Sequence, residues 1–286
     1  MPQALLESTR QIQSLRSGFR PRIGIVLGSG LGPLADRIDH GQIIPFADLV
    51  GFPNPRVAGH SGNLIIGQLS GCQIALLQGR CHLYEGWSVE QTVLPTQLLL
   101  ELGIELLILT NASGGINTRL SSGQVTVIDA HINALFRAIT APTSIPNPGS
   151  TTPNHFLMRT VSSYDRTWIQ RAQATAMELG FALPAVTYLA TLGPNYETRA
   201  EYRAFARMGA DVVGMSTVPE AILAMQHGVP VLAFSVVTNV ANSDVPNATE
   251  HEDVLEWSAQ ARSQLQPLVE NLIAKYVRSQ DGWPPT

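Results

Sequence analysis

A polar segment directly after an apolar run offers the clearest chemistry in this sequence. Residues 73–78 are largely apolar, and Arg80, His82 and Tyr84 follow at alternating positions. In extended backbone this spacing turns all three side chains to one side. A guanidinium matches the geometry of a phosphate, and a histidine supplies a further donor. A lone arginine is usually a surface ion-pair partner and a lone tyrosine a core aromatic, but the three together favour an anion site.

Three other predicted strand ends carry residues suited to anions. Residues 28–32 read GSGLG and could form a nest of backbone N–H groups with the Ser29 hydroxyl, although alone an ordinary turn is the better explanation. This run has neither the dinucleotide spacing G-x-G-x-x-G nor the Lys-Ser/Thr of a Walker loop. In the run NASGG at 111–115, small side chains let backbone amides approach a ligand. Ser216 and Thr217 precede a predicted helix, where they could bind an anion or simply cap the helix.

Two further segments have side chains suited to a purine base. Tyr196 and Glu197 come together at the start of a predicted helix, and Asn239 follows a buried strand directly after Thr238. Glu197 could also be a carboxylate favoured by the helix dipole alone. His251, between two glutamates, begins the last helix and could be no more than a solvated helix end.

These residues need a scaffold that alternates strands and helices. Apolar runs bounded by turn residues predict strands at 23–27, 63–69, 73–78, 105–110, 124–129, 184–191 and 229–238, with another before Ser216. Helical spacing predicts helices at 3–17, 88–102, 165–180, 197–209, 217–227 and 251–277, with Thr217 as a cap, Pro219 in a first turn and Pro267 as a candidate kink. The alternation predicts an α/β fold: a single domain over 1–286 with a central mixed β-sheet flanked by helices. The segment 141–156, with four prolines, predicts an irregular surface loop.

Composition excludes several classes of partner and site. Charged residues make up 14% of the chain, and 18 basic against 22 acidic residues give a net charge of −4. This balance offers no general attraction to nucleic acid or an anionic membrane. Cys72 and Cys81 are too few for a disulfide framework or a four-cysteine zinc site. With no signal-peptide pattern and no uninterrupted apolar span, we expect a cytoplasmic protein.

The segments taken together resemble a known family. The sequence is similar to the trimeric, low-molecular-mass purine nucleoside phosphorylases, in the family that includes methylthioadenosine phosphorylase. The matching segments follow the family's order over most of the chain: GIVLGSGLG (24–32), GHSGNLIIG (59–67), LLQGRCHLYEG (76–86), LILTNASGGIN (107–117), YLATLGPNYETRAE (188–201), GADVVGMSTVPEA (209–221), VVTNVA (236–241) and HEDVLE (251–256).

The resemblance implies a role for each candidate residue. Phosphate would be held by Ser29, Arg80, His82, the amide of Ala112 and Ser216, with His60 close by. The ribose would contact Tyr84 and Met215, with His251 at its 5′-hydroxyl. The purine would be held by Tyr196, Glu197 and Asn239, with Thr238 beside them. The residues implied in catalysis are His82, Glu197, Asn239 and His251. A homotrimer is also implied, in which the neighbouring subunit lends an aromatic ring, but this sequence has Leu157 at that position with Phe156 next to it.

The implied activity is phosphorolysis of 6-oxopurine nucleosides such as inosine and guanosine, in purine salvage, with phosphate as a co-substrate and without metal or cofactor. Methylthioadenosine phosphorylase is the nearest alternative, but those enzymes carry an acidic residue where this chain has Asn239 and a small apolar residue in place of His251. A glycoside hydrolase usually needs two carboxylates, and the strand ends offer only Glu85 and Glu197. A dinucleotide oxidoreductase disagrees with the glycine spacing. A non-catalytic nucleotide-binding module would not need an anion site beside a base site.

Overall fold

The computed structural model describes residues 3–28, 31–137, 139, 162–240 and 251–279, and of 251–255 only the backbone. The helices are α1 (Gln3–Leu15), α2 (Val89–Glu101), α3 (Arg166–Glu178), α4 (Arg199–Met208), α5 (Val218–Gln226) and α6 (His251–Arg278). The strands are β1 (Ile23–Leu27), β2 (Asp39–Pro45), β3 (Asn63–Leu69), β4 (Cys72–Gln78), β5 (Leu106–Gly115), β6 (Val125–Asn133), β7 (Ala185–Ala190), β8 (Val212–Gly214) and β9 (Val231–Val240). Short 3₁₀ turns lie at Gly32–Arg37, Phe46–Asp48 and Leu83–Glu85.

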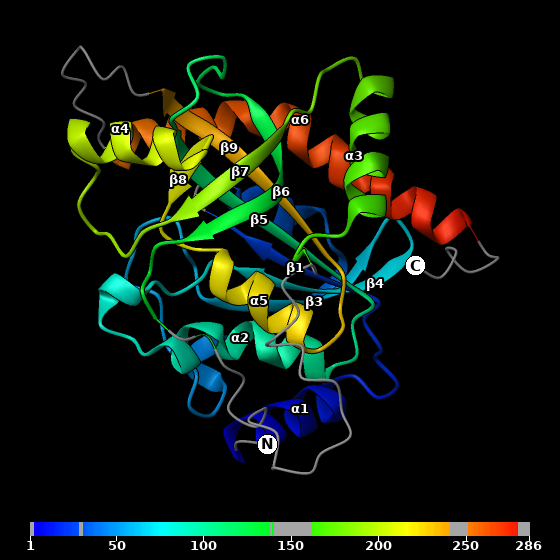
Figure 1. Cartoon of the computed structure of the whole chain (residues 1–286). Helices are drawn as coiled ribbons and strands as arrows, with labels where there is room; N and C mark the ends of the chain where they lie inside the picture. Colours follow the sequence, from blue (N-terminus) through cyan, green and yellow to red (C-terminus); the bar gives the residue numbers. More distant parts are fainter. Residues whose placement is uncertain (1–2, 29–30, 138, 140–161, 241–250, 280–286) are drawn as a thin grey trace, which may run out of the picture.

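The strands form one mixed sheet in the order β2-β3-β4-β1-β5-β8-β7-β6-β9. β1 is parallel to β4 and β5. β3 is antiparallel to both of its neighbours, β2 and β4. β9 also pairs with β5, so that β5, β8, β7, β6 and β9 close into a ring of five strands (Figure 1). This sheet, flanked by helices, confirms the predicted fold class.

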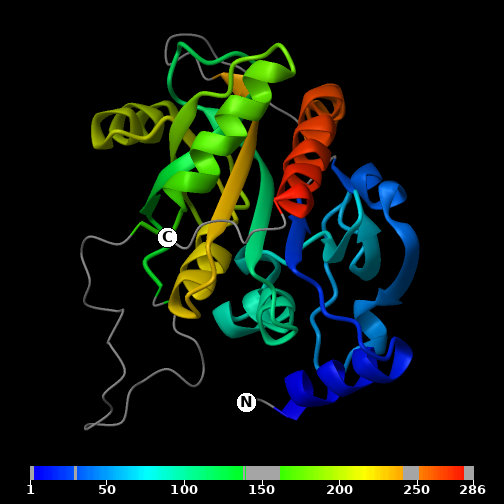
Figure 2. The same ribbon diagram turned by 90° about the vertical axis from the view of Figure 1, so that its right-hand side faces the viewer.

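Helices cover the sheet on more than one side. α2 packs against α5 and α1, whereas α6 packs on β9 and α3 and also reaches β4 and β6. Figure 2 shows α6 running between the ring and the part of the sheet formed by β2, β3 and β4. The central strand β1 is buried along its whole length, as its apolar sequence requires. Within the described ranges, none of the helices combines the length and apolar character that crossing a membrane demands.

Two parts of the sheet differ from the sequence-based expectation. β2 was not predicted, because Ile44 is its one buried residue and it therefore lacks an apolar run. β5 was predicted to end at residue 110 but continues to Gly115, because its polar and glycine-rich half pairs with β9 and β8. α6 continues through Pro267. The predicted loop at 141–156 lies outside the described residues.

Candidate active site

A cavity of about 360 Å³ opens where β4, β5, β8 and β9 end. Its walls bring together most of the residues selected from the sequence: His60, Arg80, His82, Tyr84, Ala112, Tyr196, Glu197, Met215, Ser216, Thr238 and Asn239. Three more lining residues, Asn111, Ser113 and Gly114, belong to the run 111–115 singled out from the sequence. Residues without a role assigned from the sequence also line the cavity: Val57, Pro194, Tyr202, Val213 and Gly214. Ser29, Phe156, Leu157 and the side chain of His251 lie outside the described residues.

Arg80 sits at one end of the cavity in a buried ion pair. Its Nε donates to Oε1 of Glu220 at 3.1 Å and its Nη2 lies 3.1 Å from Oε2, with the two side chains only 4% and 7% exposed. Nη1 donates to the carbonyl of Thr110 at 2.7 Å and lies 3.4 Å from Oγ of Ser216. These contacts hold the guanidinium in one orientation, and the paired carboxylate offsets the cost of burying its charge.

His60 is held next to Arg80 through the backbone. The backbone N–H of Arg80 donates to Nδ1 of His60 at 3.3 Å, so Nδ1 carries a lone pair. Gly79 makes this approach feasible: its φ is +108°, and a Cβ there would lie 2.7 Å from Cα and Cβ of His60. A glycine is therefore required at this position for conformation and for space.

His82 is oriented by Glu85. Oε1 of Glu85 accepts from the backbone N–H of His82 at 2.6 Å and lies 3.1 Å from its Nδ1, which leaves Nε2 available to a ligand. Burial raises the pKa of Glu85, but hydrogen bonds from His82 and the backbone of Arg56 outweigh it and bring the pKa below its usual value. The Glu85 carboxylate therefore stays ionised and fixes the histidine ring.

Tyr84 reaches the cavity by a different geometry from the one predicted. It lies in the 3₁₀ turn Leu83–Glu85 and not in extended backbone. The prediction that extended backbone turns Tyr84 to the same side as Arg80 and His82 was therefore wrong, although Tyr84 does line the cavity. Its ring instead stacks on the ring of His82, with centroids 4.9 Å apart and planes 17° apart. Burial raises the pKa of Tyr84 to about 12, so the phenol stays neutral.

Ser216 and Thr217 precede α5 and belong to a buried hydrogen-bond chain. Oγ of Ser216 lies 3.2 Å from Oγ1 of Thr217, which accepts from Nδ2 of Asn111 at 2.8 Å. Oδ1 of Asn111 accepts from Ser235 at 2.6 Å, and Ser235 in turn contacts the Ser113 hydroxyl at 2.6 Å. Thr217 occupies the N-cap position with φ +70° but makes no capping hydrogen bond, so the predicted capping by its side chain was wrong; the hydroxyl is engaged by Asn111 instead.

Another part of the cavity wall carries Asn239 and Glu197. Thr238 donates to Oδ1 of Asn239 at 3.2 Å, so this contact uses none of the donor capacity of the amide NH₂. Oε1 of Glu197 accepts from Oγ1 of Thr191 at 3.2 Å. Burial, reinforced by the charge of Glu201, raises the pKa of Glu197 against the opposing effect of hydrogen bonds from its own backbone, Thr191 and Tyr202.

Tyr202 is the most informative residue that sequence reasoning missed at this end. It is half-buried on α4, and its hydroxyl interacts with both Glu197 and Asn239. Tyr196, by contrast, is 48% exposed at the rim of the cavity. Among the described residues, no group of three or more His, Cys, Asp or Glu side chains gathers as it would around a metal ion.

Comparisons with known proteins agree with this architecture. The sequence model of the family described as "Phosphorylase superfamily" matches residues 22–274. Purine nucleoside phosphorylase 1 of Bacillus subtilis is 38% identical over 90% of this chain and 93% of its own. A crystal structure of Schistosoma mansoni purine nucleoside phosphorylase with adenosine superimposes with a TM-score of 0.83 at 34% identity, covering 100% of this chain and 99% of that one. A crystal structure of the Schistosoma mansoni enzyme with inosine superimposes with a TM-score of 0.82 at 35% identity, covering 96% of each chain.

The fold is therefore that of a nucleoside phosphorylase, an enzyme class that transfers a pentosyl group to phosphate. The chain belongs to the purine nucleoside phosphorylases of the phosphorylase superfamily, and it catalyses the phosphorolysis of purine nucleosides.

Proposed function

We propose that the preferred substrates are 6-oxopurine ribonucleosides and deoxyribonucleosides, such as inosine and guanosine, which are converted to the free base and (deoxy)ribose 1-phosphate in purine salvage. The observation that supports this proposal is that Asn239 and Glu197 line the same cavity as Arg80, His82 and Ser216. The first pair suits a base with a carbonyl at position 6. The second set suits phosphate.

The proposed mechanism follows from the charges that develop. Phosphate attacks C1′ as the glycosidic bond breaks through an oxocarbenium-like state, so positive charge grows on the ribose and negative charge on the purine. Phosphate held by Arg80, His82, Ser216, Ser29 and the amide of Ala112 would stabilise the sugar cation. Tyr84 and Met215 would hold the ribose between the two ends, with His251 at the 5′-hydroxyl. Most of the rate gain would come from this positioning, and the proposal requires neither metal nor cofactor.

Base selectivity rests on the hydrogen-bonding capacity of two side chains. Asn239 can accept from N7–H of the departing base while donating to a carbonyl at position 6. An ionised Glu197 can accept from N1–H, which 6-oxopurines carry and adenine lacks. Adenosine would leave at least one buried group unpaired, and sites of this kind can discriminate by roughly 10⁴-fold. Tyr196 at the rim and Thr238 beside Asn239 would complete the contacts to the base.

The test compares inosine and adenosine with and without phosphate. Base release from inosine should be saturable in phosphate and negligible without it, and adenosine should be a very poor substrate. Asn239→Asp should lose the donor to O6, gain an acceptor for an amino group and shift relative activity towards adenosine. Equal cleavage of both nucleosides by the wild type, or an unchanged ratio in the variant, would refute the assignment of Asn239.

Two further expectations stay proposals. A homotrimer predicts a mass near three chains in sedimentation equilibrium, and a cytoplasmic location predicts recovery in the soluble lysate fraction. Methylthioadenosine phosphorylase is the alternative activity. It would show as efficient cleavage of methylthioadenosine in the same assay. The amide of Asn239 argues against this activity, because methylthioadenosine phosphorylases carry an acidic residue at that position.

A further inference from the structure

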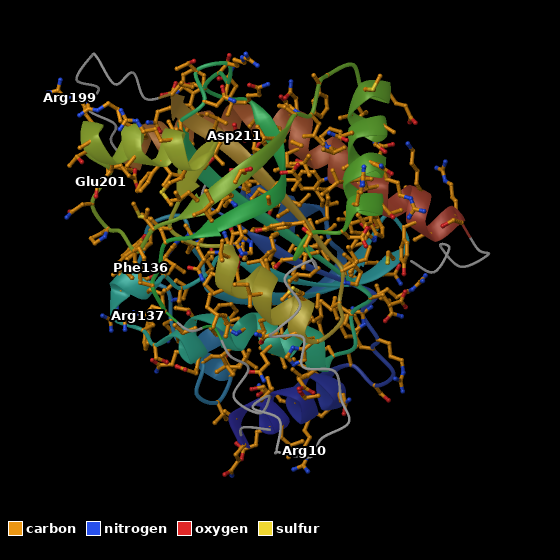
Figure 3. All side chains as sticks on the ribbon, viewed as in Figure 1. Arg10, Phe136, Arg137, Arg199, Glu201 and Asp211 are labelled. Atoms are coloured by element: carbon orange, nitrogen blue, oxygen red, sulfur yellow. The ribbon has the colours of Figure 1, made fainter. Side chains whose placement is uncertain are left out.

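Tyr202 occupies the inward side of α4, the helix that begins just after Glu197. Thr198 starts this helix by accepting from the backbone N–H of Glu201. Arg199 and Glu201 are exposed and point away from the sheet in Figure 3, whereas Tyr202 and Phe205 pack against a small apolar cluster. That cluster consists of Ile116, Leu189, Ala210 and Val213. The ring of Tyr202 is thus fixed by packing, while its hydroxyl extends into the wall of the cavity.

The Tyr202 hydroxyl lies over Gly114, at the base end of the cavity. A Cβ on Gly114 would lie 3.2 Å from the Tyr202 oxygen and 3.5 Å from Oδ1 of Asn239, so both oxygens lie above the same glycine. The hydroxyl interacts with the carboxylate of Glu197 and with the side chain of Asn239. A tyrosine hydroxyl has one proton to donate and lone pairs to accept, so it can donate to a carboxylate and accept from an amide NH₂ at once.

We propose that Tyr202 is a positioning residue for base recognition, whose hydroxyl joins Glu197 to Asn239 and thereby holds both side chains in the orientation that a 6-oxopurine requires. This inference rests on the proposed base-reading roles of Glu197 and Asn239. In the proposed arrangement the Tyr202 hydroxyl makes two hydrogen bonds: it donates to the Glu197 carboxylate and accepts from the Asn239 amide. Neither contact uses the groups needed for N1–H and O6, because a carboxylate has a second oxygen and an amide has a second N–H.

The ionisation of the neighbouring groups is consistent with this arrangement. Burial, and next the charge of Glu197, raises the pKa of Tyr202 to about 12, so the phenol remains a donor at neutral pH. Its hydrogen bond in turn lowers the pKa of Glu197, in opposition to burial and to the charge of Glu201. Two other neighbours have side chains that do not titrate: Thr191, which contacts Glu197, and Asn239, which contacts Tyr202. The charge of Tyr196 contributes to raising the pKa of Tyr202.

The decisive experiment is a double-mutant cycle on kcat/KM for inosine at saturating phosphate, with Tyr202→Phe, Glu197→Gln and the double variant. Tyr202→Phe keeps the ring and its packing, so it isolates the hydroxyl. Loss of the hydroxyl should lower kcat/KM about 10-fold in the wild type and have little effect once Glu197 is replaced, because coupled residues are not additive. The KM for phosphate should not change.

A pH series distinguishes positioning from mere structural support. Without the hydroxyl, the pKa of Glu197 rises, so the loss of hypoxanthine affinity on acidification should begin at a higher pH in Tyr202→Phe than in the wild type. Tyr276→Phe is the matched control, because Tyr276 also contacts a glutamate, Glu105, but not in the cavity; it should leave both measurements unchanged.

Equal losses from Tyr202→Phe in the presence and absence of Glu197, or an acid limb that does not move, would overturn the role of Tyr202. A failure of the proposed function would look different. In that case Glu197→Gln alone would leave inosine cleavage intact, or the wild type would accept adenosine as well as inosine.

Discussion

Arg80 and Glu220 are 140 positions apart in the sequence, yet they form a side-on ion pair beneath the proposed phosphate site, with two N–O separations of 3.1 Å. The carboxylate at the start of α5 balances the guanidinium while no anion is present. A bound phosphate would add negative charge next to a cation that is already partly neutralised. If phosphate binds Arg80 as proposed, the pair is expected to link stability to the binding of phosphate.

Glu220→Gln should destabilise the phosphate-free protein by about 3 kcal/mol, because a buried cation loses its counter-charge. Phosphate would then supply the missing negative charge, so it should raise Tm more in the variant than in the wild type. Thermal unfolding with and without phosphate measures both effects. Glu105→Gln is the control: its pair with Arg22 is about half exposed, and such pairs contribute at most about 1 kcal/mol. Identical phosphate-induced shifts in Glu220→Gln and the wild type would contradict this account.

Glu197 predicts a pH dependence of base binding. Burial raises its pKa above the ordinary 4.5, so it becomes protonated at a higher pH than a solvated glutamate. A protonated carboxyl cannot accept from N1–H in the same way; affinity for hypoxanthine should therefore be full above the raised pKa and decline as the pH falls through it. Calorimetry in phosphate-free buffer measures this without interference from the ionisation of phosphate. Glu197→Gln should bind with no such decline, and a similar decline in that variant would assign it to another group.

Gly79→Ala should damage the phosphate end specifically. The φ of +108° is strained for alanine, and the added Cβ would meet His60 at 2.7 Å. We expect a loss of roughly 1–3 kcal/mol in stability and a rise in the KM for phosphate, while the KM for inosine changes less. Gly103→Ala is a suitable control for the backbone term alone, since its φ is +84° and nothing lies within 4 Å of the added carbon. Equal changes in stability and in the KM for phosphate in the two variants would show that the contact with His60 does not cause the effect of Gly79→Ala.

His251 begins α6, and its implied contact with the 5′-hydroxyl can be tested by substrate deletion. His251→Ala should lower kcat/KM for inosine by about 1–3 kcal/mol, the value of one hydrogen bond to a buried polar group. The loss on 5′-deoxyinosine should be much smaller, since that substrate cannot make the bond. Equal losses of kcat/KM on inosine and 5′-deoxyinosine would show that His251 does not contact the 5′-hydroxyl and is only a residue at the start of the helix.

Local pattern was sufficient to predict the apolar strand segments that precede Arg80, Ala112 and Asn239, because each apolar run ends in polar or small residues. It could not predict that β5 and β9 pair to close the ring, since strand pairing depends on contacts remote in the sequence. Tyr202 was missed for a related reason. An aromatic residue on the inner face of a helix predicts core packing, and its ring does pack on a core cluster while the hydroxyl alone reaches the cavity.

The ring of strands also affects how this protein can associate with others. An open sheet has two edges on which a foreign strand could add, but here the pairing of β5 with β9 leaves β2 as the free edge of the sheet among the described strands. β2 is a poor template, because its register with β3 is interrupted between Asp39 and Gln42 and most of its side chains are exposed. Irregular, polar edges of this kind resist edge-to-edge aggregation. As far as the described strands are concerned, assembly of several copies is therefore expected to use side-chain surfaces instead of continuing the sheet from one molecule into the next.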